Sequence, residues 1–207
     1  MIIIIILPSI QITDYMKKYL LKIYFTLSLL LAADIAVYCL YKISIRGYYA
    51  DIILFWLWFF GSIFVIIVYW KKLLAKLFLG VIILALILSM LPMGLFFYAF
   101  IFSSTPAGLW MNKDLNENYR TQIVSYSVMV PPMLQIVEKK GLFEKQIIQC
   151  TDSELRDRNL EVSIRNSKDL ILQKDTDRSI TLTLFYGGPN TTLTFDKATG
   201  KLIKIEK

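Results

Sequence analysis

Histidine is absent from the 207 residues of this sequence, and cysteine occurs only twice, as Cys39 and Cys150. Histidine titrates near neutral pH and is the commonest general base and transition-metal ligand in proteins. Its absence excludes a Ser-His-Asp or Cys-His catalytic site. The two cysteines lie far apart in segments of different polarity, which argues against a disulfide framework. With no activating neighbour in the sequence, Cys150 is expected to be passive.

Motifs for binding phosphate or metal are also lacking. The segment GGPN at residues 187–190 follows an expected strand but opens no helix, and it has no Lys-Ser/Thr pair of a nucleotide loop. The segment KDTD at residues 174–177 offers two carboxylates, whereas a calcium loop needs several more oxygen ligands in fixed register. We interpret it as a solvated hairpin turn, with a calcium site as the weaker alternative. The sequence thus predicts no enzyme, with no catalytic residue, no cofactor and no metal site.

The net charge of +7 is unevenly distributed along the chain. Residues 1–102 carry eight Lys/Arg and three Asp, whereas residues 103–207 carry fifteen Lys/Arg and thirteen Asp/Glu. The basic excess therefore belongs mainly to the apolar half, where it indicates membrane topology. Because the polar half has no basic stripe, we predict no nucleic-acid partner.

Long apolar runs dominate the first half, at residues 19–41, 52–70 and 77–102. Each is close to or above the ~20 residues that an α-helix needs to cross a bilayer. Pro92 interrupts the third run, and because proline has no N–H, we expect a kink or tilt near Pro92–Gly94. If the first run were a cleaved signal peptide, two spans would remain. The run continues past its poor cleavage site, LAAD, to residue 41, so we favour three retained spans in contact with the lipid bilayer.

The residues before the first span, 1–18, are expected to form a short N-terminal cytoplasmic segment. The segment MKKYLLK, which begins at Met16, is typical of the start of a bacterial membrane protein. We interpret residues 1–15 as the product of an upstream start codon, with a short interfacial segment as the alternative.

The pattern changes after residues 103–108, an expected linker, to the period-two alternation of strands. Residues 109–207 are predicted to form a mainly antiparallel β domain of six or seven strands, with one helical turn at residues 151–158. The expected strands fall at residues 119–130, 134–149 (a hairpin turning at 139–141), 160–166, 169–173 and 179–206. The last segment, TFDKATGKLIKIE, resembles the final hairpin of small bacterial envelope domains of the PepSY type. The predicted fold is three transmembrane α-helices followed by a small extracytoplasmic β domain.

Asp34 is the candidate functional or assembly residue within the membrane, because a carboxylate is costly in lipid. On a helix, Ser28, Ala32, Ala36 and Cys39 form a stripe of small residues that a neighbouring helix can approach closely. Asp34 falls nearly opposite that stripe. We therefore expect one helix to pack against the stripe, and Asp34 to be buried against the remaining helix or another polypeptide. Alternatively, the carboxyl group is simply hydrogen-bonded to a nearby tyrosine, or protonated.

These features predict a non-enzymatic protein of the bacterial inner membrane whose β domain binds or scaffolds a protein partner. Immunity proteins against secreted toxins and accessory subunits of envelope machines have this layout. The alternative function is that of a subunit of a transport or ion-conducting assembly that uses Asp34.

The short loops predict the orientation. Six lysines flank the N-terminal end of the first span or lie between the second and third spans, against three Lys/Arg on the opposite side. Since cytoplasmic loops carry the excess of Lys/Arg, the N-terminus is expected inside and the β domain outside. Alkaline phosphatase fused after Lys207 should therefore be active, because it folds only outside the cytoplasm. An inactive fusion, with a green fluorescent reporter that lights up at the same position, would contradict this orientation.

Overall fold

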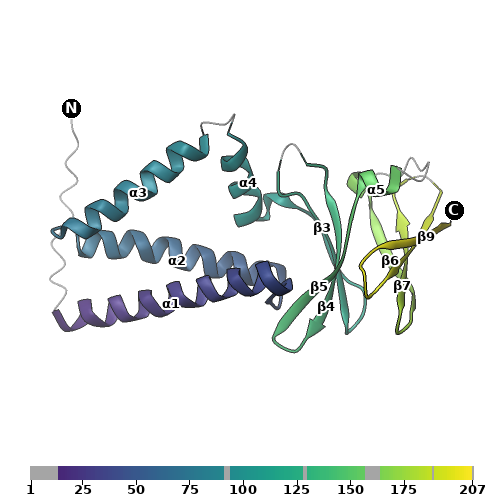
Figure 1. Ribbon diagram of the computed structural model, residues 1–207, viewed down its shortest axis with the longest axis horizontal. Coiled ribbons are helices and arrows are strands. Elements are labelled where there is room, and N and C mark those ends of the chain that lie inside the picture. Colours follow the sequence, from purple (N-terminus) through teal and green to yellow (C-terminus); the bar gives the residue numbers. More distant parts are fainter. Residues whose placement is uncertain (1–13, 91–93, 128–129, 157–163, 188, 207) are drawn as a thin grey trace.

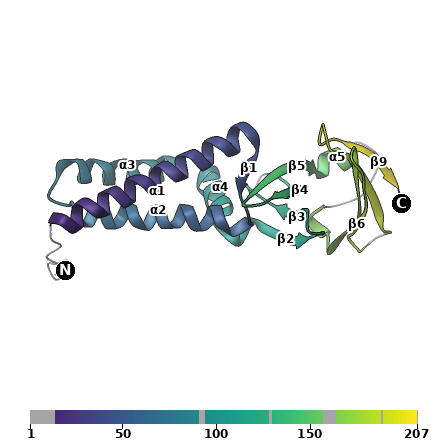
Figure 2. The ribbon, with the colours of Figure 1, turned by 90° about the horizontal axis from the view of Figure 1, so that it is seen from below.

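The computed structural model describes residues 14–90, 94–127, 130–156, 164–187 and 189–206 (Figure 1). A group of helices lies at one end of the elongated molecule and two β-sheets lie at the other (Figures 1 and 2). The expectation for residues 1–15 falls almost entirely outside the described part of the chain.

Three helices are long and apolar enough to cross a membrane, which confirms the predicted fold class. They are α1 (Asp14–Tyr41), α2 (Tyr48–Val68) and α3 (Leu73–Met90). Their apolar side chains face outwards: Phe25 and Leu74 are more than 70% exposed in the isolated chain. Such surfaces are stable only in lipid, so this is a membrane protein.

Helices α1 and α2 pack side by side through polar contacts. The Trp58 indole N–H donates to the Ser28 hydroxyl at 3.0 Å, and the Tyr24 and Ser62 hydroxyls lie 2.9 Å apart. Nearer the other end, the Tyr69 hydroxyl donates to the Lys17 carbonyl. Hydrogen bonds of this kind hold helices together where lipid removes the hydrophobic driving force.

The third predicted span, residues 77–102, is not one helix. Helix α3 ends at Met90, and a separate short helix, α4 (Leu95–Ser104), follows Gly94. Gly94 has a φ of 68°, a left-handed conformation that glycine adopts without a steric penalty. The expected kink is therefore a full break, and α4 leads to the β domain (Figure 1).

Of the expected linker, residues 103–108, the first two belong to α4, and Ser104 and Gly108 are buried. The linker contains a 3-10 turn at Pro106–Gly108, and the Ser125 backbone N–H donates to the Gly108 carbonyl at 2.7 Å. A Cβ atom at Gly108 would lie 2.5 Å from the carbonyl oxygens of Phe102 and Ser125. Only glycine fits this close approach between α4 and the β domain.

The β domain consists of two antiparallel sheets. The first, in the order β1-β5-β4-β3-β2, contains β1 (Ile43–Ile45), β2 (Leu109–Asp114), β3 (Tyr119–Val124), β4 (Met133–Lys140) and β5 (Phe143–Thr151). The second, β6-β7-β8-β9, contains β6 (Asp169–Asp175), β7 (Ser179–Phe185), β8 (Thr191–Asp196) and β9 (Leu202–Glu206). The described part of residues 109–207 thus has eight strands, more than the six or seven expected.

The short helix is found where it was predicted, whereas two of the expected strands differ from the structure. The predicted helical turn is present as α5 (Asp152–Arg156). Of the strand expected at residues 160–166, residues 160–163 lie outside the described chain, and Ile164–Asn166 form a 3-10 turn. The expected strand at residues 119–130 ends at Val124.

The core lies between the two sheets. Its central members are fully buried apolar side chains from both sheets, from α5 and from the 3-10 turn: Ile123, Leu134, Ile136, Ile148, Leu155, Ile164, Leu170, Leu182, Leu193 and Phe195. In the first sheet these residues alternate with polar ones, so its second face is polar. That polar face is turned towards the helices.

The strand β1 is part of the connection between α1 and α2, yet it forms the edge of the first sheet. Its residues pair with β5 from Ile43 opposite Lys145 to Ile45 opposite Phe143. Flanking bonds extend the pairing, because the Gln146 N–H donates to the Lys42 carbonyl and the Arg46 N–H to the Leu142 carbonyl, both at 2.9 Å. The β domain is thereby attached to the helices through a strand as well as through α4.

Replacing Arg46 by proline removes the N–H that donates to Leu142 and should loosen β1 from β5. The amide of Gln146 is expected to exchange with deuterium roughly two- to tenfold faster, because a net hydrogen bond contributes about 0.5–1.5 kcal/mol. Arg46→Ala keeps the backbone N–H and serves as the control in hydrogen-exchange mass spectrometry. Equal exchange in the two variants would show that the pairing does not depend on this bond.

Candidate functional site

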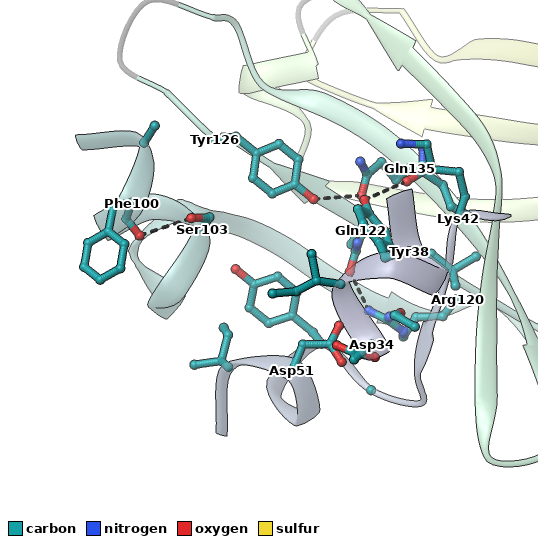
Figure 3. Close-up of a pocket in the computed structure, with 18 residues that line it drawn as sticks. Asp34, Tyr38, Lys42, Asp51, Phe100, Ser103, Arg120, Gln122, Tyr126 and Gln135 are labelled. Carbon is teal, nitrogen blue, oxygen red and sulfur yellow. Dashed lines mark hydrogen bonds between the residues drawn. The ribbon is translucent and has the colours of Figure 1, made fainter. Parts of the chain in front are cut away.

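A cavity of about 600 Å³ lies between the domain-side ends of the helices and the polar face of the first sheet (Figure 3). We call it the juxtamembrane pocket. Its apolar wall comes from α1, α2 and α4, and includes Ile35, Ile52 and Phe100. Its polar wall comes from the helix ends and from the sheet: Asp34, Tyr38, Lys42, Asp51, Arg120, Gln122, Tyr126, Gln135 and Gln146.

Helix α1 places Asp34 in this pocket. Between residues 21 and 41 of α1, the partly buried residues recur with helical spacing on the side facing α2: Tyr24, Leu27, Ser28, Leu31, Asp34 and Tyr38. Ala32, Ala36 and Cys39 are exposed instead. The expectation that a helix packs against the stripe of small residues is therefore wrong within this chain. Ser28, at the edge of the stripe, does contact α2 through Trp58, but the contact of Tyr24 with Ser62 holds α2 on the side of α1 away from Ala32 and Ala36.

The alternative expectation for Asp34, a hydrogen bond to Tyr38 or Tyr41, is not seen. Tyr38 donates its hydroxyl hydrogen to the Gln146 side-chain oxygen at 3.3 Å, not to Asp34. Within the described chain, the Asp34 carboxylate forms no hydrogen bond or ion pair. It lies near a second carboxylate, that of Asp51, close enough for the two charges to repel each other (Figure 3).

Asp51 lies in the first turn of α2, a position where the helix dipole favours a negative charge. One of its carboxylate oxygens, Oδ1, is buried and has no hydrogen-bond partner among the described residues. Asp51 does not stand out in the sequence, because an acidic residue at the end of a span is ordinary. Its significance depends on its proximity to Asp34.

The sheet supplies a buried ion pair. The Arg120 guanidinium on β3 binds the Glu144 carboxylate on β5, and the side chains are only 9% and 2% exposed. Arg120 also donates to the side-chain oxygens of Gln122 at 2.7 Å and Asn112 at 2.9 Å. These bonds satisfy most of the donors of the guanidinium, so Arg120 is fixed in place by the sheet.

Amide and phenol groups complete the polar wall. The Gln122 side-chain N–H donates to the Gln135 oxygen at 2.8 Å, and the Tyr126 hydroxyl donates to the same oxygen at 3.5 Å (Figure 3). Burial raises the pKa of Tyr126 above its ordinary value, so this phenol stays neutral at physiological pH.

The charges around the pocket do not balance. Asp34, Asp51 and Glu144 are opposed by Arg120 and Lys42, and Arg120 is already paired with Glu144. Lys42 lies over the Tyr38 ring, with its ammonium nitrogen 5.1 Å from the ring centre, and forms no ion pair with a described residue. Two carboxylates thus face the pocket without a bound counter-charge from the described chain.

Other chemistry-bearing groups lie elsewhere. Cys150 is fully buried in the core between the sheets, and burial raises the pKa of its thiol. In the KDTD segment, Asp175 forms an ion pair with Lys197 at 2.5 Å, and Thr176 closes a turn with Ser179, as expected for a hairpin turn. Across the residues that the structure describes, no group of three or more Cys, Asp or Glu could hold a metal ion.

Comparisons with known proteins add no relative: no protein-family model, no curated protein and no solved structure matches this chain.

The Arg120–Glu144 ion pair is expected to stabilise the polar wall of the pocket. Glu144→Gln is expected to lower the free energy of unfolding by about 3–5 kcal/mol, because it leaves the arginine buried without a counter-charge. Unfolding by denaturant in detergent, followed by tryptophan fluorescence, measures the change.

The partly exposed pair of Glu138 with Lys140 provides a control, since Glu138→Gln should cost less than about 1 kcal/mol. The double variant Arg120→Met/Glu144→Leu should recover most of the loss, because two apolar groups need no partner. If Glu144→Gln costs no more than Glu138→Gln, the buried pair does not stabilise the site.

Proposed function

We propose that this protein is a non-enzymatic binding protein of the bacterial inner membrane whose juxtamembrane pocket receives a positively charged group from a protein partner. The single observation that carries the proposal is that Asp34 and Asp51 face the pocket together and neither forms an ion pair with a described residue. A lysine or arginine next to an apolar segment of the partner has the matching chemistry. Its charge would meet the carboxylates, and its apolar part would lie on Ile35, Ile52 and Phe100.

The physical basis is the cost of placing carboxylates near lipid. An ionised carboxylate loses hydration there, and a second one nearby adds repulsion. A cation placed between the two carboxylates offsets both the lost hydration and the repulsion. The attraction between opposite charges is also stronger where the dielectric constant is low. The unpartnered oxygen of Asp51 also provides a hydrogen-bond acceptor for an ammonium or guanidinium group.

The proposed orientation places the N-terminus in the cytoplasm, and the pocket and β domain on the periplasmic side. It follows from the distribution of Lys/Arg between the short loops. A partner that arrives from outside, or laterally through the membrane, would then reach the pocket. This arrangement suits an immunity-like protein or an accessory subunit of an envelope complex.

The transport alternative has less support from the geometry. Asp34 lines a cavity at the domain-side end of the helices. Farther along the α1–α2 contact, Leu27 and Leu31 are partly buried, and the Trp58–Ser28 hydrogen bond joins the two helices. A conducting subunit would need a polar path across the bilayer, whereas the polar side chains farther along α1 and α2 bond to one another. The recognition of a cation at one surface requires only the groups that are present.

The test uses the full chain in nanodiscs of zwitterionic lipid and a dansyl-labelled polyleucine peptide that carries one lysine near its domain-side end. We expect energy transfer from the tryptophans of the protein to the dansyl group. Asp34→Asn and Asp51→Asn should each weaken binding about tenfold, which corresponds to the loss of about 1.4 kcal/mol. Asp177→Asn, at an exposed turn carboxylate, is the matched control and should bind as the wild type does.

A peptide with norleucine in place of lysine should bind weakly to every variant. Equal binding of the two peptides, or unchanged binding by both pocket variants, would contradict the proposal. Octylammonium is a further probe, which tests for a small amine as the ligand. If it protects the protein against thermal unfolding and the lysine peptide does not bind, the ligand is a small amine or an amino-lipid. The proposal of a protein partner then fails.

A further inference from the structure

The turn between β4 and β5 carries two adjacent apolar side chains. Leu142 is 81% exposed and Phe143 is 54% exposed. Turns of this kind usually carry polar residues, and Gly141, with a φ of 64°, supplies the left-handed conformation that the turn needs. Nothing in the fold of the β domain requires a leucine at the neighbouring position. We call residues 140–143 the hairpin tip.

The fold fixes this tip beside the membrane helices. The Arg46 side chain donates to the Gly141 carbonyl at 3.2 Å, and the Arg46 backbone N–H donates to the Leu142 carbonyl. Arg46 belongs to the short connection between α1 and α2. In Figure 1 the tip lies at the same position along the molecule as the domain-side ends of these helices. Leu142 is therefore held at the level where the helices leave the lipid.

Aromatic side chains mark that level independently. Tyr41 at the end of α1 and Tyr49 at the start of α2 are 63% and 49% exposed. Tyrosine is enriched where lipid headgroups meet the hydrocarbon, because its ring is apolar and its hydroxyl is polar. The hairpin tip adds a leucine and a phenylalanine to the same belt.

The charges around the tip suit a lipid surface. Arg46, Lys140 and Lys145 are exposed, and Lys42 lies nearby at the end of α1. Lys140 forms a partly exposed ion pair with Glu138, and Lys145 forms no ion pair with a described residue. A cationic rim around apolar side chains matches a membrane interface, where phosphate groups lie above hydrocarbon.

We propose that the hairpin tip is a membrane-contact site: Leu142 and Phe143 insert into the leaflet on the side of the β domain, and the surrounding Lys and Arg residues bind lipid phosphates. The occupant of this apolar surface is lipid. The contact would hold the first sheet at a fixed depth above the bilayer, and with it the polar wall of the juxtamembrane pocket. The β domain would then be attached at three places: α4, β1 and the tip.

The experiment uses the full chain in lipid vesicles, with Cys39 replaced by serine so that the exposed native thiol is not labelled. The buried Cys150 stays in place. The environment-sensitive fluorophore NBD is attached at Leu142→Cys, and in a second protein at Phe143→Cys. Ile203→Cys, 51% exposed, is the matched control, because its strand, β9, lies at the end of the molecule away from the helices (Figure 1).

The label at the tip should emit at shorter wavelength than the label at residue 203. It should be quenched by doxyl groups on lipid chains and protected from iodide in the water, and the control label should behave in the opposite way. The shift should increase with anionic lipid, and Lys140→Gln/Lys145→Gln should remove that increase. If both tip labels are as accessible to iodide as the control, the tip does not enter the bilayer. An emission independent of lipid charge would overturn the proposed phosphate contacts.

Discussion

The pairing of β1 with β5 is the interaction on which the rest of the structure depends. Without it, the β domain would be joined to the helices only through α4 and the residues that follow. With it, the connection between α1 and α2 becomes the edge of the first sheet. The pairing therefore fixes the position of the sheet relative to these two helices. Backbone hydrogen bonds suit this role, because they are directional and do not depend on side-chain rotamers.

The juxtamembrane pocket is a consequence of that attachment. Strand β1 brings the ends of α1 and α2 up to the polar face of the sheet, so that Asp34 and Asp51 lie near Arg120 (Figure 3). The contact at Gly108 closes the connection from α4 on the other side. A sheet with one apolar face and one polar face thus has both faces partly covered, the first by the second sheet and the second by the membrane helices. The pocket lies where the two polar surfaces meet.

The helices differ in how far the chain itself covers them. Helices α1 and α2 share hydrogen bonds, whereas Ala75 is the one residue of α3 that is buried within the described chain. Lipid can cover the remainder of α3, since its side chains are as apolar as the acyl chains. Helix α4 is tied to α2 by the Trp56 indole, which donates to the Ser104 carbonyl at 2.7 Å, and by the contact of Phe55 with Phe100. The attachments to the β domain are therefore concentrated in α1, α2 and α4.

The sequence alone determined the features that depend on local pattern. Apolar runs gave the three long helices, period-two alternation gave the antiparallel domain, and Pro92 with Gly94 marked the break in the third run. Asp34 was visible because a carboxylate within an apolar run is unusual.

Tertiary structure alone decided what Asp34 faces, that Asp51 joins it, and that the three-residue β1 belongs to the sheet. Alternation cannot tell whether Arg120, Gln122 and Gln135 face water or a pocket, because that depends on which distant segment covers the face. The stripe of small residues had the same ambiguity, because small residues and hydrogen-bonding residues both favour helix contact. The contacts of Trp58 with Ser28 and of Ser62 with Tyr24 place α2 on one side of α1 and leave Ala32, Ala36 and Cys39 exposed.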